Sequence, residues 1–123
     1  MIRVAVLVIS SKILSGQETD KNRKSLEDIL TNNQLTLLSY EVVTDDRQAI
    51  SHRLATICQT AGPHIILTLG GTGVRPTDWA PEATRDVIDK EIPGIGEAMR
   101  AESLKKVGTA MLSRGTAGIK GTT

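Results

Sequence analysis

A glycine-rich loop directly follows the short apolar run of residues 65–69. Glycines leave space for a ligand to approach the backbone, and successive N–H groups in such a turn form a concavity that binds an anion. The loop leads through Asp78 to a helix that we predict to begin at Pro81, because proline is favoured at the first helical position. We therefore predict a cradle for a phosphorylated ligand, formed by Gly70, Gly71, Thr72 and Gly73.

The loop matches neither of the two common nucleotide-binding fingerprints. No Lys-Ser or Lys-Thr pair follows its glycines, which excludes a P-loop. The first apolar run, residues 4–9, is not followed by the G-x-G-x-x-G pattern of dinucleotide folds. A nicotinamide-dependent oxidoreductase is therefore a disfavoured alternative.

Three apolar runs predict the strands of an open α/β sheet. Residues 4–9 are apolar without interruption, which is typical of a central strand in a parallel sheet. Residues 35–43 mix apolar and polar side chains, so we expect a strand nearer an edge. Residues 65–69 are again continuously apolar, and we expect them to be buried on both faces.

Helical periodicity separates these strands and continues after the last one. We expect a helix capped by Asp20, a second helix that ends before Gly62, the Pro81 helix, and a further helix after Pro93. The only cysteine, Cys58, lies on the apolar stripe of the second helix and is expected in the core. Strands alternating with helices predict right-handed crossovers within one α/β domain over residues 1–123.

Polar residues follow the predicted strands, where an open α/β sheet binds its ligands. Ser10 follows the first strand, Asp45 the second, and the glycine loop with Asp78 the third. Carboxylates beside an anion cradle repel the anion unless a cation lies between them, and Mg²⁺ held by one or two carboxylates plus substrate phosphates meets this need. The pattern therefore points to phosphoryl or nucleotidyl transfer.

Each acidic residue also has a purely structural interpretation. Asp45 or Asp46 could simply cap the next helix, an interpretation that for either residue weighs equally with a functional role. Asp78 could be only a turn residue, although its position after the glycines favours function. For Asp20 a helix cap is the favoured role, and for Trp79 packing over the loop is favoured over lining a pocket.

Composition excludes several classes of protein. The 15 basic and 14 acidic residues nearly cancel and form no block, which disfavours binding to nucleic acid or to a membrane surface. A single cysteine builds neither a disulfide framework nor a cysteine metal site within one chain. No apolar run is long enough to cross a bilayer, so the expected location is the cytoplasm.

Four motifs and Asp78 together resemble the molybdopterin adenylyltransferase family of molybdenum cofactor biosynthesis proteins, which includes the related G domain of gephyrin. The motifs are TLGGTG at 68–73, APEAT at 80–84, IPG at 92–94 and AMLSRGTAGI at 110–119. The resemblance implies a three-layer αβα domain with a mostly parallel sheet, assembled as a homo-trimer or, in some branches, a homo-hexamer. It also implies an enzyme whose substrates are ATP and molybdopterin and whose cofactor is Mg²⁺.

The implied reaction gives adenylyl-molybdopterin and pyrophosphate, and the resemblance assigns a role to each candidate residue. Asp45 and Asp78 match the functional aspartates, which serve Mg²⁺ and phosphate orientation. Ser10 and Asp20 match the nucleotide side of the site. Molybdopterin is expected to contact Ser113 and the loop residues Gly70, Gly71, Thr72 and Gly73.

Three departures from the family pattern favour a relative that lacks the enzymatic activity. Ser11 stands where the family often has aspartate, and Asn22 and Arg23 stand where it often has a Ser-Gly pair. The family also continues past the position of Thr123 with a strand, a Pro-Gly loop and a helix. We therefore expect the sequence to be incomplete at its C-terminus, with a truncated relative as the alternative. A non-catalytic relative that binds pterin or nucleotide, or serves as a scaffold, is therefore the main alternative.

Overall fold

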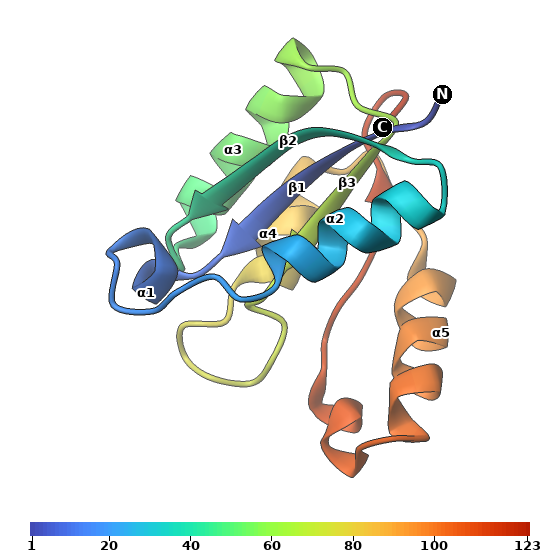
Figure 1. The fold of residues 1–123 in the computed structure, drawn as a ribbon. Helices are drawn as coiled ribbons and strands as arrows, with labels where there is room; N and C mark the ends of the chain where they lie inside the picture. The colour runs from blue at the N-terminus through green and yellow to red at the C-terminus, as the bar shows by residue number, and fades with distance from the viewer.

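A parallel sheet of three strands forms the centre of the computed structural model, which describes residues 1–123 (Figure 1). The strand β1 (Arg3–Ile9) lies between β2 (Thr36–Val43) and β3 (Ile65–Leu69). The continuous apolar run of β1 is buried from Val4 to Ile9, which confirms the predicted central strand. The register brings the carboxyl ends of all three strands to one edge of the sheet, since Ile9 pairs with Val43 and Val8 pairs with Leu69.

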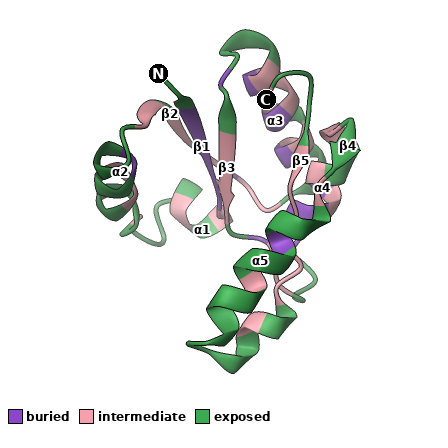
Figure 2. Ribbon diagram, turned by 90° about the vertical axis from the view of Figure 1, so that its right-hand side faces the viewer, coloured by how far each residue is buried: buried purple, intermediate pink, exposed green.

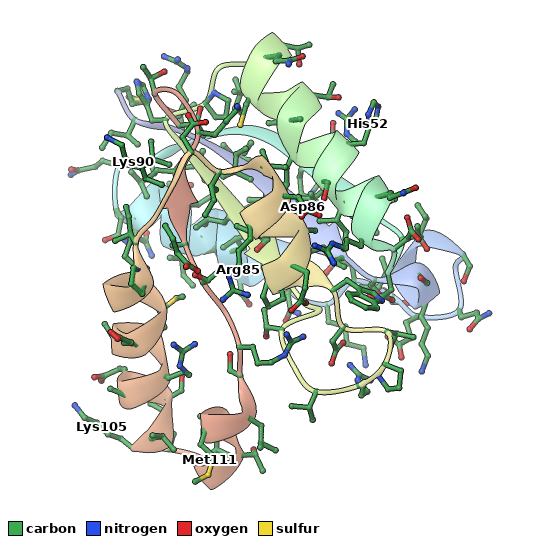
Figure 3. All side chains as sticks on the ribbon, turned by 180° about the vertical axis from the view of Figure 1, so that it is seen from behind. His52, Arg85, Asp86, Lys90, Lys105 and Met111 are labelled. Atoms are coloured by element: carbon green, nitrogen blue, oxygen red, sulfur yellow. The ribbon has the colours of Figure 1, made fainter.

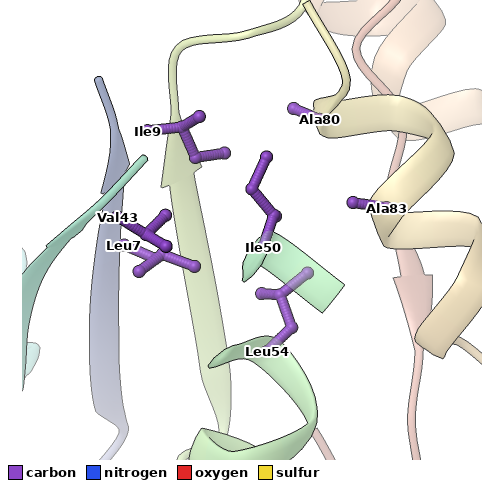
Figure 4. Packing of buried hydrophobic residues seen from close by; sticks show 7 residues of the cluster. All are labelled: Leu7, Ile9, Val43, Ile50, Leu54, Ala80 and Ala83. Carbon is purple, nitrogen blue, oxygen red and sulfur yellow. The ribbon is translucent and has the colours of Figure 1, made fainter. Parts of the chain in front are cut away.

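Helices cover both faces of this sheet, so the predicted three-layer αβα architecture is confirmed (Figure 1). One face of β1 packs against α2 (Arg23–Asn32). The other face packs against α3 (Arg47–Thr60) and α4 (Ala80–Val87). Side chains of a strand alternate between its faces, so β1 supplies both layers of the core. Figure 4 shows the second layer, formed by Leu7, Ile9, Val43, Ile50, Leu54, Ala80 and Ala83.

Two expectations about burial are wrong. The strand β3 is only half-buried, and Ile65 is 39% exposed, because β3 pairs with β1 alone and forms an edge of the sheet. A continuous apolar run does not by itself distinguish a central strand from an edge strand. Cys58 is half-buried on α3 rather than fully within the core.

The connection between β1 and α2 differs from its prediction. A short helix, α1 (Ser11–Leu14), begins directly after β1, where the sequence predicts only a polar segment. Asp20 does not cap α2, because α2 begins after Asn22. Asp20 Oδ1 instead accepts a hydrogen bond from the Asn22 N–H (3.1 Å) in the turn before the helix.

Residues 90–119 form a separate arm beside the sheet (Figure 2). Its elements are β4 (Lys90–Glu91), α5 (Pro93–Leu104), the 3₁₀ helix η1 (Gly108–Leu112) and β5 (Gly118–Ile119). The strands β4 and β5 pair antiparallel. The sequence does not predict them, because a strand of two residues leaves no recognisable pattern in a sequence. The helix after Pro93 is confirmed, but its apolar stripe is largely exposed. None of the helices in the structure has the length and apolarity that a membrane crossing requires.

Gly96 is the point at which α5 packs against the returning chain. It is the one buried residue of α5, and a Cβ placed there would lie 2.3 Å from the Gly115 carbonyl oxygen. Both partners of this contact are backbone, so neither can move away without shifting an element. The contact therefore holds α5 beside the segment that leads into β5.

Gly96→Ala should lower the free energy of unfolding by about 1–3 kcal/mol, the usual cost of overpacking a close contact. Gly94→Ala is the matched control, because it lies in the same helix and its added Cβ would have no neighbour within 4 Å. Urea denaturation of both variants measures the difference. Equal stability of the two would show that the close contact between α5 and Gly115 is absent.

Candidate functional site

The glycine loop after β3 and the end of η1 face each other across a cavity of about 440 Å³. The cavity lies past the carboxyl end of β3, the position predicted from the sequence. It contains the predicted residues of the cradle together with Asp78 and Ser113. Its lining comprises Gly70, Gly71, Thr72, Gly73, Val74, Arg75, Asp78, Thr109, Leu112 and Ser113.

The loop reaches this position by crossing closely over the end of β1. Gly70 adopts φ +100°, and a Cβ there would lie 2.6 Å from the Ile9 carbonyl oxygen. Both the left-handed backbone and the close approach require glycine. The cradle is therefore set directly beside Ser10, the residue that follows β1.

Asp78 is the buried carboxylate of the cavity, with 6% of its surface exposed. Its Oδ2 accepts a hydrogen bond from the Arg75 N–H (3.1 Å) and lies 3.5 Å from Arg75 Nε. A Cβ at Gly73 would lie 2.7 Å from the same Oδ2, so glycine at 73 makes room for the carboxylate. The other oxygen, Oδ1, accepts no hydrogen bond from the chain and is therefore available to a ligand in the cavity.

Arg114 holds the glycine loop in place through its backbone and its guanidinium. Its N–H donates to the Thr72 carbonyl (2.7 Å), and its Nε donates to the Gly73 carbonyl (2.8 Å). Its Nη2 donates to the Asp78 carbonyl (2.9 Å). The planar fork of arginine can serve several acceptors at once, which the single ammonium group of lysine cannot reproduce. One side chain thus fixes both ends of the loop that carries the cradle.

The fourth partner of Arg114 is the Glu82 carboxylate in the first turn of α4. The hydrogen bond from Arg114 lowers the pKa of the Glu82 carboxyl below its usual value, so Glu82 stays charged. Its second oxygen, Oε1, is buried without a hydrogen-bond partner. Because an unpaired buried charge is unfavourable, α4 also depends on Arg114.

Ser113 lies between η1 and Arg114, and its side chain lines the cavity. Its hydroxyl oxygen accepts a hydrogen bond from the Gly115 N–H (3.3 Å). This weak contact leaves the hydroxyl hydrogen free to donate to a ligand.

Asp45 and Ser10 lie at the same edge of the sheet but outside the cavity lining. Asp45 Oδ2 accepts from the Ser11 N–H (3.0 Å), and the Asp45 N–H donates to Ser11 Oγ (2.9 Å). The Ser10 hydroxyl accepts from the Ile13 N–H (3.1 Å) and caps α1. Of the two neighbouring aspartates, Asp46 is the cap of α3, with its Oδ2 accepting from the Ala49 N–H (2.9 Å). Asp45 is therefore a link between α1 and the end of β2.

Asp20 belongs to a third group, formed with Tyr40 and Arg23. The Tyr40 hydroxyl donates to Asp20 Oδ2, and burial together with this hydrogen bond raises the pKa of Tyr40 to about 12. The Arg23 guanidinium lies over the Tyr40 ring, 4.6 Å from its centroid, and also donates to Glu27 (2.8 Å). Asp20 and Arg23 are thus already engaged with neighbours in the chain.

Comparison with known proteins identifies the family of this chain. Residues 5–122 match the family described as "Probable molybdopterin binding domain". The chain belongs to the molybdopterin binding domain family. It is 40% identical over 121 residues to the molybdopterin adenylyltransferase of Helicobacter pylori J99, covering 97% of this chain and 69% of that protein. The corresponding enzyme of Escherichia coli K12 is 38% identical over 115 residues, covering 92% of this chain and 59% of that protein.

A solved member of the family has the same fold. The molybdopterin biosynthesis enzyme MoaB from Thermus thermophilus superposes with a TM-score of 0.90 at 39% identity, covering 98% of this chain and 76% of that one. The chain therefore spans between 59% and 76% of the lengths of these three relatives. The expected molybdopterin-binding fold is thus confirmed, and the relatives are longer than the chain.

In this family member, the candidate residues predicted from the sequence separate into three groups. The cradle, Asp78 and Ser113 share one cavity, whereas Asp45 with Ser10 and Asp20 with Tyr40 lie in their own hydrogen-bond networks. Trp79, at the start of α4, is 39% exposed and does not line the cavity. Sequence reasoning missed Arg114, although its position next to Ser113 in the AMLSRGTAGI motif was a usable signal.

The side chains of the cavity could hold Mg²⁺ only together with phosphate oxygens of a bound substrate. The structure contains no group of three or more His, Cys, Asp or Glu residues that could hold a metal ion. Asp78 nevertheless offers one free carboxylate oxygen beside a cradle for phosphate. Because Mg²⁺ is commonly held by one or two carboxylates with substrate phosphates and water, Asp78 fits this cation.

Arg114→Lys should loosen the cradle while leaving the fold intact, because lysine keeps the charge but loses the fork. The amides of Arg75 and Asp78, which are hydrogen-bonded within the loop, should exchange at least about tenfold faster with deuterium.

The matched control is Arg47→Lys, which disturbs a two-pronged pair with Asp86 (2.8 and 2.9 Å) away from the loop. It should leave exchange at Arg75 and Asp78 unchanged. Loop exchange in Arg114→Lys as slow as in the unmodified chain would show that Arg114 does not hold the loop.

Proposed function

We propose that this chain is a molybdopterin adenylyltransferase that acts in molybdenum cofactor biosynthesis, in the cytoplasm. The supporting observation is the single cavity that combines an anion cradle, a buried carboxylate with a free oxygen, and the Ser113 hydroxyl. The two curated relatives described above bear this enzyme name. Their names and the chemistry of the cavity point to the same class of ligand.

In the proposed reaction, an oxygen of the terminal phosphate of molybdopterin attacks the α-phosphorus of ATP. A phosphorus–oxygen bond forms to the AMP group, the bond between the α- and β-phosphates breaks, and pyrophosphate leaves. Adenylyl-molybdopterin is the second product. Such transfers depend on positioning and on neutralising phosphate charge, which are the tasks that the cradle can perform.

The cradle and Ser113 are assigned to molybdopterin. The backbone N–H groups of the glycine loop would bind phosphate oxygens, and the Ser113 hydroxyl would donate to the pterin ligand. Asp78 Oδ1 would hold Mg²⁺, which when bound neutralises phosphate charge. Arg75, which lies beside Asp78 and is exposed, would bind a phosphate at the mouth of the cavity.

The nucleotide side of the site is assigned to Ser10 and Asp20, with Asp45 between them and the cavity. The support for this assignment is the common strand edge to which Ser10 and Asp45 belong. Binding of ATP by Asp20 would require this carboxylate to share or release the Tyr40 hydroxyl. Asp45 would orient α1, and it retains one oxygen, Oδ1, without a hydrogen bond in the chain.

A non-catalytic molybdopterin-binding protein is the second candidate. The observation in its favour is Arg23, which occupies the start of α2 and is engaged with Tyr40 and Glu27. A bulky side chain at this position restricts the close approach of phosphate to the backbone. This candidate predicts binding of molybdopterin without formation of adenylyl-molybdopterin.

Asp78→Asn should lower the rate of adenylyl transfer at least about tenfold, because the neutral amide neither holds Mg²⁺ nor balances its charge. The assay combines the purified chain with molybdopterin and Mg²⁺-ATP and measures pyrophosphate and adenylyl-molybdopterin. Asp28→Asn is the matched control, since Asp28 is an exposed aspartate of α2 paired only with Lys24.

An unchanged rate in Asp78→Asn would remove Asp78 from the reaction. Absence of product together with measurable molybdopterin binding would favour the non-catalytic candidate.

We also propose that the chain assembles as a homo-trimer, or as a hexamer built from trimers. The exposed apolar side chains of the arm support this assembly, since Ile95, Met99 and Met111 are exposed by 45%, 52% and 67%. Met111 is labelled at the end of the arm in Figure 3. Sedimentation equilibrium should give a trimer, and Met99→Glu should weaken association by at least about tenfold. Lys105→Gln, an exposed change in the same arm, is the control. A chain that stays monomeric at all concentrations would contradict the assembly.

A further inference from the structure

A second cavity, of about 400 Å³, lies on the other side of the segment that joins η1 to β5. It shares Ser113 with the lining of the first cavity but is otherwise formed by α4, β4, α5 and this segment. Apart from Pro93 and Gly115, every residue that lines it has a polar or charged side chain. Its lining comprises Arg85, Glu91, Pro93, Arg100, Ser113, Arg114, Gly115 and Thr116.

Positive charge is in excess in this second cavity. Three arginines face a single carboxylate in its lining. Arg114 is paired with Glu82, and Arg85 Nε lies 3.0 Å from Glu91 Oε2. Arg100 makes no ion pair with any carboxylate, because its Nη1 donates only to the carbonyls of Gly115 (2.7 Å) and Ser113 (3.4 Å). One guanidinium charge is therefore left without a counter-charge.

Hydrogen-bond donors are also in excess. A guanidinium has five N–H groups. The Nε and Nη2 of Arg100 and both Nη atoms of Arg85 donate to no acceptor in the chain. Glu91, the one acidic residue of the lining, uses Oε2 for both Arg85 Nε and the Thr116 hydroxyl (2.6 Å), while its Oε1 accepts no hydrogen bond from the chain.

The arginines are held by the fold and do not simply project into solvent. Arg100 is half-buried, and the close packing of Gly96 on Gly115 fixes its helix beside the cavity. Arg85 projects from α4 toward the same segment (Figure 3), where Glu91 orients its guanidinium. Two forks from different elements thus border one polar cavity, an arrangement that suits phosphate oxygens.

We propose that the second cavity binds an oxyanion of the phosphate class through Arg85 and Arg100. Two guanidinium groups and a cavity of this volume suit a diphosphate better than a single phosphate. The anion would be either free pyrophosphate or the phosphate group of a larger molecule. This inference concerns a site separate from Asp78, and it holds whether or not the chain transfers AMP.

The test is calorimetric titration of the full chain with pyrophosphate, orthophosphate and AMP at constant ionic strength. We expect pyrophosphate to bind, and Arg85→Gln and Arg100→Gln each to raise its Kd about five- to tenfold. Arg47→Gln, on α3 away from the cavity, is the matched control and should leave the Kd unchanged. Tighter binding of AMP than of orthophosphate would identify the phosphate of a larger molecule as the source.

Arg85→Gln keeps the test decisive if Arg100→Gln fails to fold, because Arg85 is half-exposed and its guanidinium makes no hydrogen bond to the backbone. Arg75→Gln distinguishes the two cavities, since Arg75 lines only the first. Unchanged pyrophosphate binding in Arg85→Gln would overturn the proposal, as would absence of pyrophosphate binding to the unmodified chain. Loss of binding in Arg75→Gln alone would place the anion in the first cavity and overturn it as well.

Discussion

The contact between Arg114 and the glycine loop joins the two parts of this molecule. The loop follows the last strand of the parallel sheet, whereas Arg114 lies in the arm, between η1 and β5. Its guanidinium and backbone bind three carbonyl groups of the loop and the Glu82 carboxylate. Without this residue the glycine loop would lose its hydrogen bonds to the segment after η1, and Glu82 would keep a buried charge without its partner.

The carboxyl ends of the three parallel strands explain where the remaining polar residues lie. Parallel strands bring their carboxyl ends together, so Ser10, Asp45 and Gly70 arrive at one edge from three separate strands. The chain uses hydrogen bonds between Ser11 and Asp45 to hold α1 against the end of β2. The polar residues at this edge therefore form two sets, a cavity with free donors and a neighbouring network that is held together by its own hydrogen bonds.

Much of the sheet and of the cavity could be predicted from the sequence. The apolar run of residues 4–9 and the glycines after residue 69 carry local signals, because burial and close backbone approach limit which residues can stand there. The half-buried position of β3 could not be predicted, since it depends on which strands pair. The role of Arg114 depends on a contact 41 residues away in sequence, between its Nε and the Gly73 carbonyl, which no local pattern encodes.

The roles of individual aspartates could likewise be predicted only in part from the sequence. Asp45 and Asp46 are adjacent and chemically identical, yet Asp46 caps α3 and Asp45 bonds to Ser11. Which residue takes which role follows from the turn between β2 and α3. Asp78 could be singled out because it follows a glycine loop, whereas its burial became known only from the structure.

If the glycine loop, Asp78 and Ser113 form one ligand-binding cavity, adding molybdopterin to the full chain should change the backbone amide NMR shifts of these residues. The largest changes should fall within residues 70–78 and 113–115, with small changes in α2 and α3. Changes confined to the region of Asp20 and Tyr40, with none in the glycine loop, would contradict it.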